Sequence, residues 1–286
     1  MASPDLKKLE THYEFGKNWA SFSDTIDEQS IAFAEEGVSK LLTRDELKGR
    51  TFLDIGCGSG IHSLAVSRLG VRQILATDID PNCIATTRVL LEKFSPGVHC
   101  ETREVSVFDI SPDKLGLWDI VYSWGVLHHT GAMYEALEKA ASVVKPGGLF
   151  VFALYRRTTR AMDRLWTLEK RWYTKASPAA KRRADSAYGS LFRLRHALTG
   201  GGYKKFVTSY KQKRGADHTH DISDWLGGYP YEVISPDEVA ALMKRLGFVH
   251  VRSIVHPGSI GLFGSGCDEF TYRRVAYGGG DGGAKT

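Results

Sequence analysis

A glycine-rich turn between two apolar runs constrains the fold of this chain more than any other feature. A short, mainly apolar run, Phe52 to Ile55, leads into Gly56-Cys-Gly-Ser-Gly60, and a helical pattern then leads to a second apolar run that ends at Asp78. Glycines at these positions allow positive φ and remove every Cβ from the turn, so a ligand can lie against the backbone where the first helix amides are unpaired. The stretch predicts a strand, a ligand-binding turn, a helix and a second strand with an acid at its tip.

The acids around this turn indicate the kind of ligand. Asp78 follows the glycines by about twenty residues, where a carboxylate at the end of the neighbouring strand accepts both ribose hydroxyls of a nucleoside. A dinucleotide turn has the pattern G-x-G-x-x-G/A, but here Ile61 takes the third small position and the third glycine comes one residue early. Asp54, just before the turn, favours a cationic ligand over a pyrophosphate, which needs only amides and the helix dipole. The turn therefore predicts a site for a nucleoside that carries positive charge.

The two motifs resemble those of a known family. Phe52-Leu-Asp-Ile-Gly-Cys-Gly-Ser-Gly60 is similar to the first motif of the class I S-adenosylmethionine-dependent methyltransferases, and Ala76-Thr-Asp-Ile-Asp-Pro81 is similar to their second. The resemblance covers about residues 50 to 155 and returns from about 235 to 276. Tyr13-Glu-Phe-Gly-Lys-Asn-Trp19 and Asp224-Trp-Leu-Gly-Gly-Tyr-Pro-Tyr-Glu232 more loosely resemble a bacterial subgroup with unknown or small-molecule substrates. The resemblance implies S-adenosyl-L-methionine as cofactor and S-adenosyl-L-homocysteine as product.

Strand and helix patterns alternate along the core. They predict strands at 73–78, near 99–107, at 118–124 and at 149–154, and helices at 60–70, 81–94 and 131–144, the last ended by Lys145-Pro-Gly-Gly148. A helix at 236–246 and strands at 248–255 and 269–275 complete the pattern. Such alternation forms right-handed crossovers and a parallel sheet. Together with the resemblance, it predicts an α/β fold: a doubly wound, mostly parallel, seven-stranded sheet of the Rossmann-like methyltransferase type, with N-terminal helices and a helical insertion between strands 5 and 6.

These patterns divide the 286 residues into five parts. Residues 1–48 are an N-terminal helical segment, 49–154 the S-adenosylmethionine-binding core, 155–232 a basic helical cap over the substrate, 233–277 the C-terminal part of the core, and 278–286 a glycine-rich disordered tail. In the resembled family, an N-terminal segment of this kind folds over the cofactor and helps to close its pocket.

Ligands of such sheets bind beyond the carboxyl ends of the strands, and the expected cofactor residues gather there. The turn and its acids supply Asp54, Gly56, Cys57, Gly58, Gly60, Asp78 and the neighbouring Ile79. The resemblance implies an adenine site at Val107, Phe108 and Asp109, and adds Ser123, Trp124, Tyr13 and Trp19. The Trp124 ring offers a face to a sulfonium. Simple packing is the alternative for Trp124 and Trp19, and a solvated strand-end cap is the alternative for Asp109.

Trp124-Gly-Val-Leu-His-His-Thr130 is the candidate methyl-transfer face. Gly125 permits a bent exit from the strand, so that His128 and His129 emerge where the sulfonium methyl must lie. Methyl transfer from a sulfonium is an in-line displacement that depends on alignment, and a histidine can take the hydroxyl proton of the acceptor. We therefore expect His129, or else His128, to be catalytic and oxygen to be the acceptor atom. The alternative is that either histidine caps the next helix or hydrogen-bonds the cofactor.

Positive charge is concentrated in the predicted insertion. The whole chain carries +5, but residues 156–214 hold seventeen Lys and Arg against three acids, a balance of +14. One face of each of two predicted helices is largely apolar. It comprises Met162, Leu165, Trp166, Trp172 and Tyr173 in the first helix and Tyr188, Leu191, Phe192, Arg195 and Leu198 in the second. We expect these faces to be core and the basic residues to cover the outside. The cap would then contact a small-molecule acceptor through His218, His220, Trp225, Tyr229 and Tyr231.

The alternative function is a nucleic-acid (RNA) modifying methyltransferase that binds phosphates through the basic insertion and stacks bases on its aromatic residues. Aromatic residues on apolar faces make nucleic acid the less favoured partner, and the same surface suits an acidic or carrier-bound small molecule or an anionic membrane. No metal is expected, because His218-Thr-His-Asp221 lacks a partner cluster of the zinc or di-metal type.

The remaining signals concern location. No apolar run approaches the ~18 residues that span a bilayer, and Met1-Ala-Ser-Pro-Asp5 lacks the pattern of a signal peptide. The four cysteines, at 57, 83, 100 and 267, have no C-x-x-C spacing, which indicates reduced thiols. We expect a cytoplasmic enzyme without a transmembrane segment.

Overall fold

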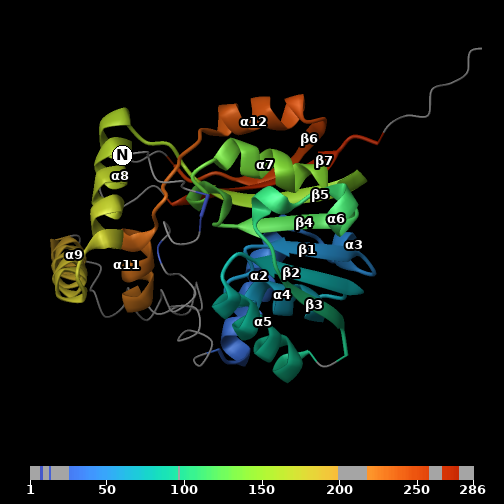
Figure 1. Ribbon diagram of the computed structural model, residues 1–286, viewed down its shortest axis with the longest axis horizontal. Helices are drawn as coiled ribbons and strands as arrows, with labels where there is room; N and C mark the ends of the chain where they lie inside the picture. The colour runs from blue at the N-terminus through green and yellow to red at the C-terminus, as the bar shows by residue number, and fades with distance from the viewer. Residues whose placement is uncertain are drawn as a thin grey trace, which may run out of the picture.

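A seven-stranded sheet forms the centre of the protein (Figure 1). The computed structural model describes residues 7–8, 13, 26–95, 97–198, 218–257 and 266–276. The strands are β1 (Thr51–Ile55), β2 (Gln73–Asp78), β3 (His99–Glu104), β4 (Trp118–Trp124), β5 (Val144–Tyr155), β6 (Phe248–Ile254) and β7 (Cys267–Arg274). Their order is β3-β2-β1-β4-β5-β7-β6, parallel from β3 to β5, with β7 antiparallel to both β5 and β6. The predicted doubly wound, mostly parallel sheet is confirmed.

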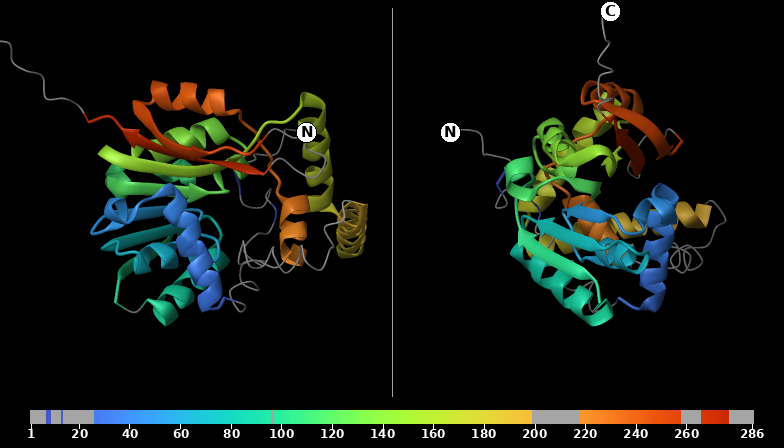
Figure 2. Two further views of the ribbon diagram at one scale, coloured as in Figure 1. Left: turned by 180° about the vertical axis from the view of Figure 1, so that it is seen from behind. Right: turned by 90° about the vertical axis from the view of Figure 1, so that its right-hand side faces the viewer.

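Helices cover both faces of the sheet (Figures 1 and 2). One face carries α2 (Glu28–Leu41), α4 (Ile61–Arg68) and α5 (Pro81–Phe94), and the other carries α7 (Met133–Ser142) and α12 (Pro236–Arg245). Because side chains alternate along a strand, Phe52 packs into the first layer and Leu53 into the second. Short connecting elements in the described ranges are α3 (Arg44–Leu47), α6 (Pro112–Leu115), η2 (Val107–Asp109) and η3 (Leu127–His129).

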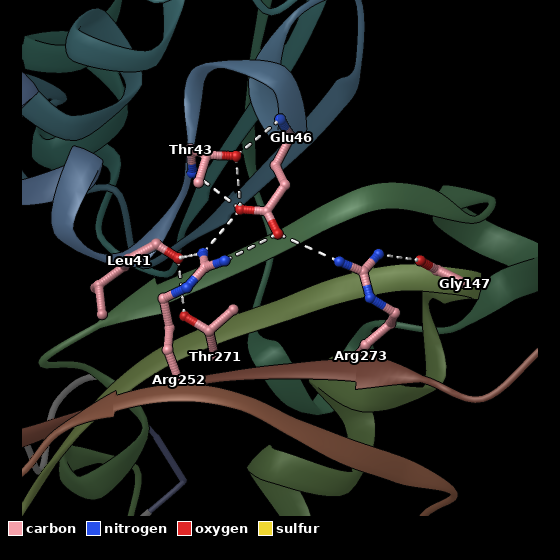
Figure 3. Close-up of polar contacts among 7 residues, drawn as sticks. All are labelled: Leu41, Thr43, Glu46, Gly147, Arg252, Thr271 and Arg273. Carbon is pink, nitrogen blue, oxygen red and sulfur yellow. Dashed lines mark hydrogen bonds and ion pairs between the residues drawn. The ribbon is translucent and has the colours of Figure 1, made fainter.

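A charged network ties the N-terminal helices to the last two strands (Figure 3). The Glu46 carboxylate accepts hydrogen bonds from Arg252 on β6, at 2.7 and 3.1 Å, and from Arg273 on β7, at 3.2 Å. Arg252 also donates to the carbonyl of Leu41 at the end of α2. Partial burial alone would raise the pKa of Glu46, but hydrogen bonds from Arg252 and Thr43 hold that pKa below its ordinary value. The network therefore holds an ionised carboxylate at neutral pH.

Two predicted boundaries were wrong, each for a local reason. The third strand ends at Glu104 and not near 107, because the Ser106 hydroxyl accepts from the amide of Phe108 and begins the 3-10 turn η2. Strand β5 begins at Val144 and includes Lys145-Pro-Gly-Gly148, which was predicted to separate a helix from a strand starting at 149. The pairing with β4 shifts register across this stretch, which accommodates the proline and glycines within the strand.

The insertion between β5 and β6 forms α8 (Arg160–Lys175), α9 (Pro178–Leu198) and α11 (His218–Gly227), which lie together beyond the end of β5 (Figure 1). Its core contains Trp166 and Tyr173 of α8. Leu165 and Trp172, predicted on the same face, are instead exposed at 57% and 53%, and Leu191, predicted on the core face of the second helix, is exposed at 44%. Successive residues of an α-helix are rotated by roughly 100° about its axis. Leu165 and Trp172, each one residue before the buried Trp166 or Tyr173, therefore point to a different side of α8. Among the helices of the described ranges, none combines the length and apolar character needed to cross a membrane.

Candidate active site

The glycine turn joins the carboxyl end of β1 to α4. Gly56 and Gly60 have φ angles of 76° and 82°, which residues other than glycine rarely adopt. A Cβ at Gly56 would collide with Val126, and one at Gly60 would lie 2.8 Å from Thr87. Helix α4 begins after Gly60 without a side-chain cap, so its first amides remain available to a ligand. Glycine is thus required at both positions, and the turn presents backbone donors.

Two buried acids flank this turn. Asp78 accepts from the amides of Gly58, at 3.1 Å, and Asp80, at 2.9 Å, and burial raises its pKa. Asp54 accepts from the Ser63 hydroxyl at 2.7 Å. Burial raises the pKa of Asp54 to about 7 against that hydrogen bond, and the nearby Asp78 acts in the same direction as burial. A cationic ligand would favour the ionised form of both carboxyls, so their environment suits a positively charged nucleoside.

A groove of about 610 Å³ runs beside the end of β2. Its lining includes Ile79 and Asp109, together with Arg103, Glu104, Val105, Ser106, Lys114 and Leu115. Val107 is buried in the core, and Phe108 lies under the ammonium of Lys7, 4.7 Å from the ring centre. The Asp109 side chain is 67% exposed and lies 3.8 Å from Lys114. Of the three predicted adenine residues, only Asp109 lines this groove, and its side chain is directed toward solvent.

The end of β4 lies next to the end of β1, from which the glycine turn begins. The Ser123 hydroxyl donates to the carbonyl of Ile55 at 2.9 Å and so links the ends of β4 and β1. The half-buried Trp124 ring meets the ring of His62 edge-on, with centroids 5.6 Å apart. Burial lowers the pKa of His62 to about 4, so this histidine, which the sequence pattern did not single out, is neutral. Burial also raises the pKa of the Cys57 thiol, which makes it an unreactive part of the turn.

Tyr13 contacts the insertion. Its amide donates to the carbonyl of Tyr229 at 3.0 Å, and its ring lies 6.2 Å from the Tyr173 ring. Gly227 lies directly against the Tyr13 ring, where a Cβ would clash. The residue therefore joins the N-terminal segment to α8 and α11, and Trp19 lies outside the described residues.

His128 and His129 are both buried, and their hydrogen bonds select opposite tautomers. Nδ1 of His129 lies 2.7 Å from the carbonyl oxygen of Pro230, which can only accept, so this nitrogen carries the proton and Nε2 has the lone pair. Nδ1 of His128 accepts from the amide of Tyr155 at 3.2 Å, so its Nε2 carries the proton. That Nε2 is buried and has no hydrogen-bond partner. Only His129 can accept a proton through Nε2, whereas His128 can donate a hydrogen bond.

An aromatic cluster surrounds these histidines on the side of the insertion. The Tyr155 ring lies 4.0 Å from the ring of His128 and 5.3 Å from that of Tyr231. Lys170 of α8 is buried beside the cluster, with its ammonium 5.2 Å from the Tyr231 ring and hydrogen-bonded to the carbonyl of Trp225. Burial lowers the pKa of Lys170 to about 8, and burial, with His129 and Lys170 nearby, lowers the pKa of His128 well below its ordinary value.

Sequence reasoning missed Tyr155 and Lys170. Tyr155 directly follows the predicted strand 149–154, so the rule that ligands bind at strand ends would have found it. Nothing in the sequence distinguishes Lys170 from the other basic residues of the insertion, which were expected on its surface. His218 and His220 lie on α11, but their side chains are outside the described residues. No group of three or more His, Cys, Asp or Glu in the described ranges is placed to hold a metal ion.

The end of the insertion holds the histidine turn in place. The amide of Glu232 donates to the carbonyl of His128 at 3.0 Å, while Pro230 accepts from His129 as described. The Glu232 carboxylate accepts from the amide of Met133 at 3.0 Å, at the beginning of α7. The turn after β4 is therefore bonded to a segment that follows it by about a hundred residues.

The strand order, the glycine turn and the acids at the ends of β1 and β2 together define the class I methyltransferase fold. A methyltransferase-domain family model matches residues 26–253, and the chain belongs to that family. The family recognised from the two sequence motifs is thereby confirmed.

Curated relatives over part of the chain are named as methyltransferases. The ubiquinone biosynthesis O-methyltransferase of Xanthomonas euvesicatoria pv. vesicatoria is 34% identical over 119 residues, 42% of this chain and 48% of that protein. The protein of the same name from Xanthomonas axonopodis pv. citri is 33% identical over 118 residues, 41% of this chain and 48% of that protein. The chain thus spans about half the length of the curated relatives it matches.

Structural similarity extends over most of the chain. The magnesium protoporphyrin IX methyltransferase of Synechocystis PCC 6803 superposes with a TM-score of 0.56 at 11% identity, over 96% of this chain and 99% of that one. An O-methyltransferase family protein from Burkholderia thailandensis superposes with a TM-score of 0.51 at 15% identity, over 85% of this chain and 55% of that one. At such low identity these similarities show the fold.

Proposed function

We propose that this protein is an S-adenosylmethionine-dependent methyltransferase that methylates an oxygen of a small molecule, with His129 as general base. The observation that carries the proposal is the pair of opposite histidine tautomers at the end of β4. Family membership supports methyl transfer. The names of the Xanthomonas relatives support an oxygen acceptor, and the Synechocystis neighbour was crystallised with bound S-adenosylmethionine.

The residues of the turn fit this cofactor. Asp78 keeps lone pairs beyond its two backbone hydrogen bonds and can accept the ribose hydroxyls. The uncapped amides of α4 and the Cβ-free surface at Gly60 fit a ligand that lies against the backbone, and Asp54 supplies negative charge near a cation. When bound, S-adenosylmethionine supplies an electrophilic methyl group on a sulfonium.

In this proposal, His129 takes the proton of the acceptor. The carbonyl of Pro230 fixes Nδ1 as the protonated nitrogen and stabilises the imidazolium that forms when Nε2 takes a proton. His128 cannot take the same role, because the amide of Tyr155 occupies its Nδ1 lone pair. Its Nε2–H instead offers a hydrogen bond that orients the acceptor oxygen. The two adjacent histidines thus divide proton removal and positioning between them.

The test compares His129→Ala with His128→Ala. Methyl transfer from labelled cofactor to a panel of catechols and other small hydroxylated aromatics gives kcat, and calorimetry with S-adenosylhomocysteine gives cofactor affinity. We expect His129→Ala to lose about 10²–10⁴-fold in kcat and His128→Ala to lose less, both with near-normal cofactor affinity. Asp78→Ala and Gly58→Val should lose cofactor binding itself. A larger kcat loss in His128→Ala than in His129→Ala would refute the assignment of the base, and unchanged cofactor binding in Asp78→Ala would refute the cofactor site.

A further inference from the structure

Every exposed residue of α8 is basic or apolar. The set comprises Arg160, Ala161, Arg164, Leu165, Leu168, Arg171, Trp172 and Lys175. The two acids of the helix lie elsewhere: Asp163 accepts from the hydroxyl of Thr158 at 2.7 Å, and Glu169 is half-buried. An ordinary solvated helix face carries both signs of charge and few large apolar side chains. The outer surface of α8 is therefore unlike that of a helix exposed only to water.

These exposed residues form two neighbouring stripes. Leu165, Leu168 and Trp172 recur at intervals of three and four residues, so they lie along one line of the helix. They are exposed at 57%, 64% and 53%. Arg164 and Arg171, seven residues apart, lie along the adjacent line, and Arg160 and Lys175 extend it at both ends. An apolar stripe bordered by a basic stripe thus runs the length of the helix.

The basic stripe has no counter-charge among the residues that the structure describes. In the part of the chain that the structure describes, Arg160, Arg164, Arg171 and Lys175 take part in no ion pair. Basic residues elsewhere on the surface do have partners: Arg68 pairs with Glu28 at 2.6 Å and Arg245 with Glu138 at 2.8 Å. The unpaired charges of α8 are therefore available to an anionic partner.

We propose that α8 docks the protein on an anionic lipid bilayer, with the stripe of Leu165, Leu168 and Trp172 entering the interface and the basic stripe contacting the headgroups. Leucine and tryptophan next to Arg and Lys on one helix surface are typical of interfacial helices. Nucleic acid fits this surface less well, because leucines neither stack on bases nor pair with phosphates. A second copy bound through the same face would bring two basic stripes together, which repel.

Docking through α8 also places the membrane near the candidate acceptor site. The opposite side of α8 carries Lys170, whose ammonium lies over the rings of Tyr155 and Tyr231 beside the histidines. Figures 1 and 2 show α8 in the group of helices that stands apart from the sheet, so the sheet does not block its outer surface. This orientation would let an acceptor enter from the interface. The docking itself does not depend on the proposed methyl transfer.

The experiment is co-sedimentation of the full chain with lipid vesicles. One set of vesicles contains phosphatidylcholine alone and the other an equal mixture of phosphatidylcholine and phosphatidylglycerol. The stripe variant combines Leu165→Glu, Leu168→Glu and Trp172→Glu. The control is Val89→Glu, because Val89 is equally exposed, at 63%, but lies on α5 at the face of the sheet. All four positions are exposed, and thermal unfolding followed by circular dichroism verifies that each variant is folded.

We expect the wild type and Val89→Glu to sediment with the mixed vesicles and to remain in solution with phosphatidylcholine alone. The stripe variant should bind at least about tenfold more weakly, and Arg164→Gln or Arg171→Gln about fivefold more weakly, with the difference reduced at high salt. Three outcomes would overturn the proposal. The first is that the wild type does not sediment with the mixed vesicles, and the second is that the stripe variant sediments like the wild type. The third is that the protein binds bulk tRNA but not the vesicles, and that Arg164→Gln weakens the binding to tRNA.

Discussion

Replacing Asp54 by asparagine should stabilise the cofactor-free protein while abolishing its ability to bind cofactor. Asp54 is buried at 2% exposure and its carboxyl accepts a hydrogen bond from Ser63, which an asparagine side-chain oxygen can also accept. The substitution therefore changes charge with little change in shape. It separates the contribution of this acid to function from its contribution to folding.

The expected magnitude follows from the pKa of Asp54. Burial raises it to about 7, whereas the carboxyl of an unfolded chain titrates near 3.8. The folded state therefore holds a proton that the unfolded state has lost, and the stabilisation from this proton is complete below about pH 4 and disappears as the pH rises to about 7. At about 1.4 kcal/mol per pH unit, Asp54 lowers the free energy of unfolding by up to about 4 kcal/mol above pH 7. Asparagine has no such dependence.

The assay is urea unfolding of the wild type and Asp54→Asn, without cofactor, at several pH values between about 5 and 8.5. The stability advantage of the variant should grow by up to about 3 kcal/mol between about pH 5 and 7 and level off above about pH 7. Calorimetry on the same preparations should show no binding of S-adenosylhomocysteine to the variant. The advantage should narrow in the presence of saturating cofactor, because only the wild type gains stability from binding.

Asp119→Asn provides a matched control of opposite sign. Although partial burial acts against it, hydrogen bonds from Thr51 and Lys145 lower the pKa of Asp119 to about 2. Asp119 therefore stabilises the folded state above about pH 4, and this stabilisation is lost as the pH falls toward 2. At neutral pH the free energy of unfolding of the variant should be lower by about 1 kcal/mol, after allowance for solvent screening. If Asp54→Asn were less stable than the wild type at pH 8, or if its advantage did not change with pH, the reasoning about the buried carboxyl would be wrong.

Two further substitutions probe the insertion between β5 and β6 and the charged network around Glu46. Lys170→Met replaces a buried ammonium by an apolar chain of similar length. We expect the free energy of unfolding in urea at neutral pH to be unchanged or higher by up to about 1 kcal/mol. A decrease of more than about 1 kcal/mol would show that the ammonium stabilises the insertion. Because the pKa of Lys170 is lowered to about 8, the advantage of methionine should shrink as the pH rises past 8. Glu46→Gln weakens the hydrogen bonds from Arg252 and should lower the free energy of unfolding by about 1–2 kcal/mol at neutral pH. This difference between variant and wild type should decrease as the pH falls below about 4.5, because the wild-type carboxyl then becomes protonated. A Gln variant with unchanged thermal unfolding would show that water satisfies the two arginines equally well.

Elements with strong local signals could be predicted to the residue. Strands 73–78 and 118–124 and helix 81–94 match β2, β4 and α5, because the strands are bounded apolar runs and Pro81 begins the helix after the capping side chain of Asp80. The start of β5 could not, because Pro and Gly usually end regular structure, and only pairing with β4 keeps Lys145-Pro-Gly-Gly148 extended. The sequence also did not predict which side of α8 is exposed, because periodicity alone does not show which of its apolar residues pack against another helix.

The sequence predicts where the candidate site lies but not how its two histidines differ. Asp54 lies just before the glycine turn and Asp78 ends the next strand, so the strand–turn–helix–strand pattern alone predicts them at one edge of the sheet. The two histidines were equivalent in sequence, because the groups that distinguish them come from Tyr155, 27 residues away, and Pro230, 101 residues away. Such partners emerge only from tertiary structure, and the tautomers depend on them.

The position of β7 affects the order in which the sheet can form during synthesis. β7 is the last of the described strands along the chain, yet it lies between β5 and β6 and pairs with both. The five parallel strands that carry the glycine turn can therefore assemble on the ribosome while β6 still lacks its partner. At roughly 5–20 residues per second, the ribosome needs about 1–4 s to add the residues from the end of β6 to the end of β7. During that interval the backbone groups of β6 and one edge of β5 are open to pairing with other nascent chains, a hazard that ends when β7 fills the gap between them.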